Sequence, residues 1–143
     1  MMKSIWKLLF AAIFLGWFGV AGSATDEVKV LYHINDSTVA RAALGNIRNH
    51  LNATEGKVKI VVVAHGNGVD FLLDGGADKN GNPYNITVEE LMGRGVDFRV
   101  CNNTLKARSI DPKSVLPGAV IVPSGVAEIG RLQAKEGYVY IKP

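Results

Sequence analysis

A run of apolar residues near the middle of the chain, residues 57–64, constrains the fold more than any other segment. Valine and isoleucine dominate it, and beyond Val58 only Lys59 interrupts the apolar sequence. A strand with one face in water alternates polar and apolar residues, whereas a near-continuous apolar run is typical of a strand covered on both faces. The sequence therefore predicts a buried parallel strand with helices packed on either side.

Helix-like and strand-like segments alternate around this run. Further β-rich stretches occupy residues 28–34, 96–101, 119–122 and 138–142. Helical patterns are expected at residues 37–51, 87–95, 103–109 and 125–136, and a glycine- and asparagine-rich loop at 74–85. Such alternation predicts βαβ units with right-handed crossovers. The predicted fold is a single three-layer α/β domain with a mainly parallel sheet of about five strands.

Local signals mark where these helices begin and end. Asp36 is a predicted N-cap, Thr87 and Glu90 match a capping box, and Gly137 stands at a helix C′ position. Residues 69–73 fit a short helix or an extended piece equally well. The apolar spacing of the last helix predicts an inner face made of Val126, Ile129, Leu132 and Gln133.

The N-terminal residues have the three parts of a secretory signal peptide. Two lysines precede an apolar stretch at residues 8–20, and small residues follow at 21–24. The predicted signal peptide spans residues 1–24, which makes the protein periplasmic or secreted, with an uncleaved anchor as the alternative. Cleavage leaves residues 25–143 as one domain with 14 basic and 13 acidic residues. Without a basic stripe interleaved with aromatic residues, nucleic acid is not an expected partner.

Ligands of open α/β sheets bind just beyond the carboxyl ends of the strands. This rule selects four short segments, at residues 35–36, 65–68, 101–103 and 124–125, which should lie on one rim of the sheet. The candidate binding residues at this rim are Asn35, Asn67, Asn102, Asn103 and Ser124.

Cys101 is the only cysteine of the chain and lies where a predicted strand meets a polar turn. It cannot form an internal disulfide, and an unpaired cysteine in an exported protein suggests a reactive thiol or intermolecular pairing. A helix start nearby favours the thiolate. By strand alternation Arg99 shares its face, but so does Asp97, which offsets the arginine. The alternative is a buried cysteine that acts as a small hydrophobic residue.

His65 is the second candidate catalytic residue, because imidazole titrates near neutral pH. It could equally hydrogen-bond a loop carbonyl. His33 falls within a predicted strand and His50 on a helix, so both are expected to be packing or surface residues. Tyr138 and Tyr140 share one face of the last strand and are expected in the core rather than in a subunit contact. The three histidines and single cysteine lack metal-ligand spacing, and no cofactor motif is present, so neither metal nor cofactor is expected.

Several segments of the chain resemble the DsrE/DsrF-like family of small α/β proteins, especially its exported, YchN-like branch. The resemblance spans residues 29–142, and the segment around Cys101 is its most specific part. The segments that carry it are residues 30–34, 60–66 with 69–73, 95–105 and 117–126.

The resemblance implies a homo-oligomer, often a trimer or hexamer, with sites near subunit interfaces. It also implies a relation to sulfur carriers, which hold a persulfide on one cysteine and pass it to a partner. In this chain Cys101 would be the acceptor and His65 a proton-transfer or orienting group, with a sulfur donor or acceptor protein or a small sulfur anion as partner. Two other functions stay open: a non-catalytic oligomeric module that binds a small anion or a partner protein, and a redox thiol that forms mixed disulfides.

Overall fold

A computed structural model describes residues 27–143, so the predicted signal peptide lies outside the described residues. One sheet has the strand order β4-β3-β2-β1-β5, and every neighbouring pair of strands is parallel. This confirms the predicted α/β fold with a parallel sheet. The strands are β1 (Val28–Ile34), β2 (Val58–Ala64), β3 (Asp97–Cys101), β4 (Val120–Val122) and β5 (Val139–Ile141).

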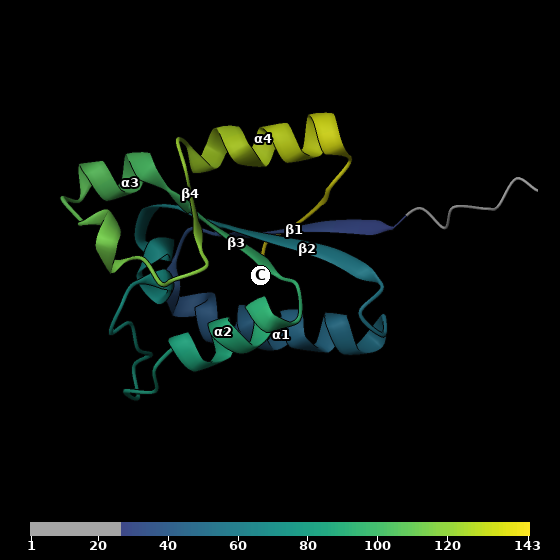
Figure 1. The fold of residues 1–143 in the computed structure, drawn as a ribbon, viewed down its shortest axis with the longest axis horizontal. Helices are drawn as coiled ribbons and strands as arrows, with labels where there is room; N and C mark the ends of the chain where they lie inside the picture. The colour runs from purple at the N-terminus through teal and green to yellow at the C-terminus, as the bar shows by residue number, and fades with distance from the viewer. Residues whose placement is uncertain (1–26) are drawn as a thin grey trace, which may run out of the picture.

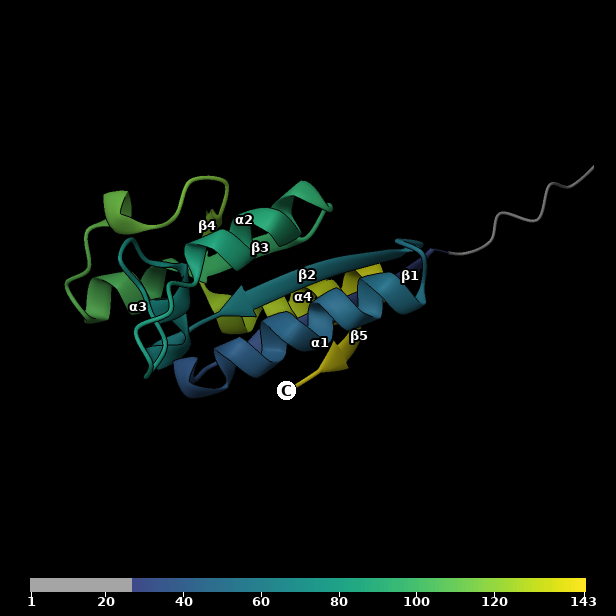
Figure 2. The same cartoon turned by 90° about the horizontal axis from the view of Figure 1, so that it is seen from below.

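Helices cover both faces of this sheet and make three layers. Figure 1 shows α1 and α2 below the sheet and α4 above it, and the turned view in Figure 2 places α1 and α4 on opposite sides. Among residues 27–143 no helix combines the length and apolar character needed to cross a membrane. The α-helices are α1 (Ala40–Ala53), α2 (Asn85–Gly93), α3 (Asn102–Ala107) and α4 (Gly125–Glu136), and the 3-10 helices are Ser37–Val39, Gly66–Leu72 and Pro112–Ser114.

The apolar run of the sequence forms β2, which lies between β1 and β3 in the sheet. Its side chains enter two separate cores. Ile60, Val62 and Ala64 belong to the larger cluster, which packs against α1 and α2. Val61 and Val63 belong to a smaller cluster that includes Leu132 of α4. Burial on both faces is the reason that this strand carries no polar and apolar alternation.

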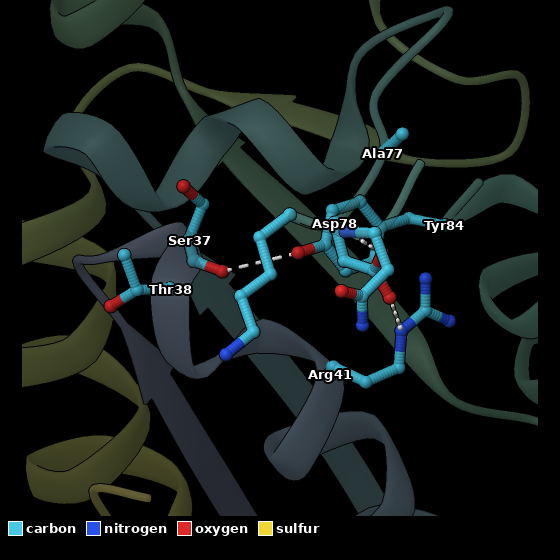
Figure 3. A pocket seen from close by; sticks show the side chains of 8 residues that line it. Ser37, Thr38, Arg41, Ala77, Asp78 and Tyr84 are labelled. Atoms are coloured by element: carbon cyan, nitrogen blue, oxygen red, sulfur yellow. Dashed lines mark hydrogen bonds and ion pairs between the residues drawn. The ribbon is translucent and has the colours of Figure 1, made fainter. Parts of the chain in front are cut away.

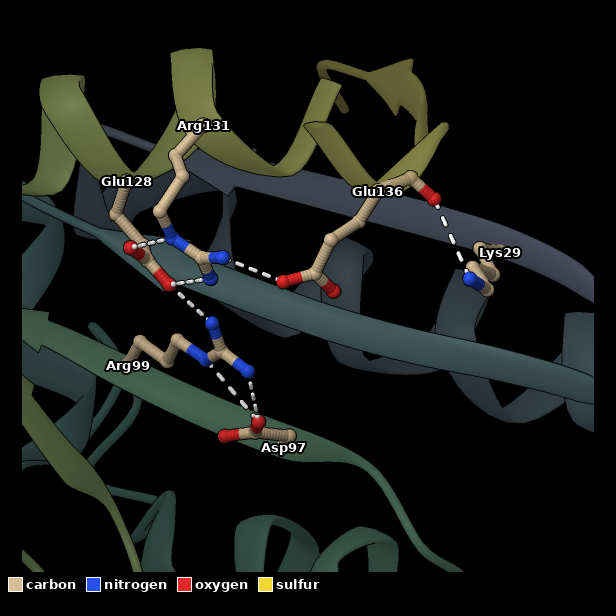
Figure 4. Close-up of polar contacts among 6 residues, drawn as sticks. All are labelled: Lys29, Asp97, Arg99, Glu128, Arg131 and Glu136. Atoms are coloured by element: carbon tan, nitrogen blue, oxygen red, sulfur yellow. Dashed lines mark hydrogen bonds and ion pairs between the residues drawn. The ribbon is translucent and has the colours of Figure 1, made fainter. Parts of the chain in front are cut away.

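A network of charged side chains holds α4 to the sheet beside the small core (Figure 4). Arg99 of β3 pairs with Asp97 at 2.5 Å and with Glu128 of α4. Glu128 also binds Arg131 at 2.8 Å, and Arg131 pairs with Glu136. Arg99 and Glu128 are the mostly buried members of the network, so their contact fixes α4 more than the exposed pairs do.

The inner face of α4 differs from the predicted one. Val126 is 65% exposed and Gln133 is also exposed, whereas Gly125 and Leu132 are buried. Residues 125, 128, 129 and 132 follow the helical repeat and face the sheet. Because successive residues of a helix point about 100° apart, Val126 points away from the sheet. The prediction for Val126 and Gln133 is therefore wrong, because a charged side chain, Glu128, occupies part of the inner face.

The local helix signals are confirmed at two places and corrected at a third. The Asp36 carboxylate accepts a hydrogen bond from the Thr38 N–H, and Gly137 ends α4 in the left-handed conformation at φ 71°. The capping box does not form, because α2 already begins at Asn85 and places Thr87 inside the helix. Glu90 instead binds Arg48 of α1 with two hydrogen bonds of 3.0 and 2.6 Å. Residues 69–73, left open by the sequence, fall mostly in the 3-10 helix Gly66–Leu72.

Candidate functional site

Two of the predicted site residues, His65 and Cys101, become neighbours at the carboxyl rim of the sheet. Val63 of β2 lies opposite Arg99 of β3 in the parallel register. His65 and Cys101 each follow two residues later, so they continue on the same face, the one that α4 covers. The parallel sheet thus brings together two side chains that are far apart in the sequence.

Gly125, the first residue of α4, packs directly against both of these side chains. A Cβ atom at this position would lie 3.1 Å from Cys101 Cβ and 3.2 Å from His65 Cβ. Glycine therefore lets the backbone at the start of α4 approach the cysteine closely. The neighbouring Ser124 hydroxyl accepts a hydrogen bond of 3.3 Å from the Ala127 N–H, so Ser124 acts as the N-cap of α4.

The environment of the Cys101 thiol favours the thiolate. Burial raises the pKa of this thiol, but the polar groups around it (the Gly125 N–H, the Thr104 hydroxyl and the N–H groups of Thr104 and Asn103) outweigh burial, so the pKa lies below its usual value. Thr104 Oγ1 accepts a hydrogen bond of 2.9 Å from the Gly66 N–H. The proton of this hydroxyl is not used in that bond and is free to point towards the sulfur. The sulfur thus lies between the starts of α3 and α4, where backbone N–H groups favour negative charge.

Nearby arginine side chains are committed to other partners. The Arg99 guanidinium is held by Asp97 and Glu128, as Figure 4 shows, so it is not a dedicated counter-ion for Cys101. The predicted offset of Arg99 by Asp97 is therefore present as a direct ion pair. Arg108 binds Asp70 at 2.7 Å and donates to the Gly66 carbonyl at 3.2 Å. Polar groups at two helix starts, rather than a positive side chain, are what favours the Cys101 thiolate.

Cys101 is only 5% exposed, so its thiol lies beneath the rim and not on the surface. The surroundings are not a purely aliphatic core, because the donors described above converge on the sulfur. The neighbouring 65–68 turn packs tightly against the end of β1. Gly68 packs against the backbone of Ile34, where an added Cβ would lie 2.2 Å from the carbonyl oxygen. The glycines of this turn therefore serve a close approach to the protein's own backbone.

His33, predicted to be a packing or surface residue, instead extends the site. Its Nε2 atom lies 2.7 Å from His65 Nε2, and the two rings stack with centroids 4.7 Å apart. Its Nδ1 atom lies 2.5 Å from the hydroxyl of Tyr140, which is 38% exposed rather than part of the core. Tyr138, in contrast, is buried as predicted. Sequence reasoning missed His33 because the face of β1 that meets His65 depends on the sheet register.

The surroundings of both imidazoles favour their neutral forms. Burial, followed by the charges of His65 and Lys142, lowers the pKa of His33 to about 4. Burial and Lys142 also lower the pKa of His65 below 6.5. Two neutral imidazoles that meet through their Nε2 atoms must share one proton, so one ring donates and the other accepts.

The predicted asparagines contribute less through their side chains than through the backbone. Asn35, Asn67 and Asn103 are exposed and Asn102 is half-buried. The backbone N–H of Asn103 is among the groups that lower the Cys101 pKa. Within residues 27–143, no three His, Cys, Asp or Glu side chains gather in a group that could hold a metal ion.

A separate pocket of about 360 Å³ lies between α1 and the 74–85 loop (Figure 3). None of its lining residues belongs to the Cys101 site. Arg41 binds Asp78 at 3.1 Å and lies 4.5 Å above the Tyr84 ring, so these side chains fasten the loop to α1. The Asp78 carboxylate also accepts hydrogen bonds from the backbone N–H groups of Asn80 and Asn82. The charged side chains of this pocket, Arg41 and Asp78, are thus already bonded to groups of the protein itself.

Comparison with known proteins identifies the family. The model of the DsrE/DsrF-like family matches residues 28–143. The structure of a protein of unknown function from Methanobacterium thermoautotrophicum, MTH1491, is similar at 37% identity and a TM-score of 0.71, over 81% of this chain and 99% of that chain. The ychN protein from E. coli shares the fold at 14% identity and a TM-score of 0.62, again over 81% and 99%. No curated protein matches the chain significantly. The chain belongs to the DsrE/DsrF-like family.

Proposed function

We propose that this DsrE/DsrF-like protein binds and relays sulfane sulfur as a persulfide on Cys101. The observation that carries the proposal is the position of the thiol, which meets N–H donors from the starts of α3 and α4 and has a lowered pKa. His65 packs with Cys101 against Gly125, and burial together with Lys142 lowers the pKa of its imidazole, so we assign to His65 the role of accepting the thiol proton.

The chemistry needs a thiolate and no outside oxidant. The Cys101 thiolate attacks the outer sulfur of a donor persulfide or of thiosulfate. One sulfur–sulfur bond forms as another breaks, and the electron pair leaves with the donor thiolate or with sulfite. The product is a persulfide whose negative outer sulfur is stabilised by the same type of N–H donors that favour the thiolate. An acceptor thiolate then takes the outer sulfur and regenerates Cys101.

The low exposure of Cys101 sets a condition on this reaction. A donor reaches the sulfur only when groups around it, such as the Gly125 backbone that packs against Cys101, move aside. In return, the enclosed position shields a bound persulfide from water and from stray thiols. The proposed partners are accordingly a donor or acceptor protein that engages the rim, or a small anion such as thiosulfate.

We further propose that the protein acts in the periplasm or outside the cell, as a homo-oligomer, a trimer or hexamer. The support for assembly is a set of exposed apolar side chains on the two edge strands and at the start of α4, which a second copy could cover. They are Val120, Ile121, Val126 and Val139. Light scattering of the purified protein tests this, and a monomer at micromolar concentration would contradict it.

Mass spectrometry tests the sulfur proposal. The purified protein is incubated with thiosulfate or polysulfide, desalted, and measured intact before and after treatment with a reducing thiol. The wild type should gain the mass of one sulfur atom, which the reducing thiol removes, whereas Cys101→Ser should gain nothing. Equal labelling of both proteins, or no labelling of the wild type, would rule out Cys101 as the sulfur acceptor.

The 5% exposure of Cys101 favours one alternative, an assembly or binding module in which the cysteine only packs. In that case Cys101→Ser keeps the affinity for a partner or small anion unchanged. A redox thiol, the other alternative, would appear as a mixed disulfide on non-reducing gels of freshly isolated protein.

A further inference from the structure

Three side chains from separate elements form a continuous hydrogen-bonded chain at the rim. The Tyr140 hydroxyl of β5 contacts His33 Nδ1 of β1 at 2.5 Å, and His33 Nε2 contacts His65 Nε2 at 2.7 Å. His65 follows β2 directly. Tyr140 is 38% exposed and therefore reaches solvent. The Cβ atoms of His65 and Cys101 both lie next to Gly125. One end of the chain thus faces water, and the other end, at His65, packs together with Cys101 against Gly125.

The chemistry of imidazole allows this chain only two orientations when both rings are neutral. In the inward orientation, the Tyr140 hydroxyl donates to His33 Nδ1, and His33 Nε2–H donates to His65 Nε2. In the outward orientation, His65 Nε2–H donates to His33 Nε2, and His33 Nδ1–H donates to the Tyr140 oxygen. Either orientation fixes the tautomer of both rings at once.

The surroundings of the pair disfavour a charged imidazolium. Burial, and then the charge of Lys142 beyond β5, lowers the pKa of both rings. On the helix above, Glu128 and Arg131 are paired with each other, and on β3 Arg99 is paired with Asp97. The groups that shift the pKa of these rings include no carboxylate, which would favour a stable imidazolium. The lowered pKa of both rings disfavours a long-lived imidazolium at either position.

We propose that Tyr140, His33 and His65 form a proton relay between solvent and the Cys101 site. This role rests on the proposed sulfur chemistry and adds the route of its proton. As Cys101 reacts with a sulfur donor, the Sγ–H proton moves to His65 Nδ1. His65 then releases its Nε2 proton to His33 Nε2, His33 releases its Nδ1 proton to the Tyr140 oxygen, and Tyr140 releases its own proton to water.

The first transfer leaves the chain inward-oriented, which suits the second half of the cycle. When an acceptor thiol takes the outer sulfur, Cys101 leaves as a thiolate and the acceptor has lost a proton. The relay then runs in reverse, from water through Tyr140 and His33 to His65, and returns a proton to Cys101. One proton leaves and one returns in each cycle, and the chain is restored. His33 and Tyr140 are thus proton-relay residues that act through His65.

The first test is nuclear magnetic resonance of protein with ¹⁵N-labelled histidine, which reports the tautomer of each ring. Tyr140→Phe removes only the hydroxyl and keeps the aromatic ring. Tyr138→Phe is the control, because it removes a hydroxyl from the buried tyrosine immediately before β5, which is not part of the hydrogen-bonded chain. The relay predicts that Tyr140→Phe changes the tautomer population of His65, which is linked to Tyr140 through His33, and that Tyr138→Phe does not. An unchanged His65 tautomer in Tyr140→Phe would overturn the proposal.

The second test is the rate of persulfide formation on Cys101 from thiosulfate between pH 6 and pH 10. General acid–base catalysis contributes about 10²–10⁴-fold, and loss of the outer end of a relay should cost on the order of tenfold at neutral pH. The deficit of Tyr140→Phe should vanish at high pH, where the thiol ionises without help. A deficit equal at all pH values would show a merely structural role and overturn the relay.

The two proposals can fail separately. If the wild type takes up no sulfur on Cys101, the sulfur function fails, while the histidine tautomers still decide whether the chain transmits a proton shift. If sulfur loads normally and Tyr140→Phe behaves like Tyr138→Phe in both tests, the relay is wrong and the sulfur function stands.

Discussion

Replacing Gly125 by alanine tests whether the start of α4 must lie against Cys101. The new Cβ would lie 3.1 Å from Cys101 Cβ, 3.2 Å from His65 Cβ and 3.5 Å from Val63 Cγ1. The first two contacts are tighter than ordinary van der Waals contacts, and both involve atoms near the backbone that cannot rotate away. Overpacking of this kind typically costs about 1–3 kcal/mol of unfolding free energy. We expect Gly125→Ala to destabilise the protein by that amount.

The same substitution should change the chemistry of the thiol. To relieve the contacts, the first turn of α4 must move away from β3, which takes the Gly125 N–H, one of the groups that lower the Cys101 pKa, away from the sulfur. The pKa of Cys101 should therefore rise towards its usual value. The assays are urea denaturation and the rate of thiol alkylation as a function of pH. In the variant, the alkylation rate should rise at a higher pH than in the wild type.

Gly130→Ala is the matched control in the same helix. Gly130 is exposed, and an added Cβ there meets nothing within 4 Å. Alanine in an exposed helix interior is favoured over glycine, so this variant should gain about 1 kcal/mol with an unchanged thiol pKa. If Gly125→Ala were as stable as Gly130→Ala, with an alkylation profile like that of the wild type, the close contact between α4 and Cys101 would be refuted.

Three further predictions concern other parts of the structure. Tyr138→Phe should raise the unfolding free energy by about 1 kcal/mol in urea denaturation, because the buried Tyr138 hydroxyl has no hydrogen-bond partner within residues 27–143; a loss of stability would show a hidden partner. His33 in the unfolded chain binds a proton below pH 6.5 but in the folded chain only below about pH 4, so stability should fall as the pH falls through this window. The full pKa change corresponds to roughly 3 kcal/mol, which solvent screening at this partly exposed site reduces to roughly 1–2 kcal/mol, and His33→Gln should flatten the profile between those pH values. Thr87→Ala should change stability by less than about 0.5 kcal/mol, because Thr87 lies inside α2 and does not cap it; a loss of about 1 kcal/mol in thermal unfolding would instead indicate a working N-cap.

The sequence was sufficient for features that depend on local pattern and on rules common to all parallel sheets. The apolar run at residues 57–64 identified a strand buried on both faces, and β2 has that position. The alternation of elements predicted the parallel sheet. A parallel sheet collects the carboxyl ends of its strands at one rim, so His65 and Cys101 could be expected near each other without any contact information. The end of α4 at Gly137 was predictable for a similar reason, since a left-handed residue at a helix end favours glycine.

Only the tertiary structure decided which side chains complete the site. Tyr140 and His33 are separated by 107 residues, and their contact depends on β5 pairing with the outer side of β1. No local pattern encodes that pairing, because residues 138–142 would read as a strand at any edge of the sheet. The rotation of α4 was hidden for the same reason. The inner face of α4 includes Glu128, which the ion pair with Arg99 of β3 stabilises there. Apolar spacing alone could not indicate a buried glutamate and selected Val126 instead. Local propensity fixes the elements, whereas the pairing of distant charged and polar groups fixes their register and rotation.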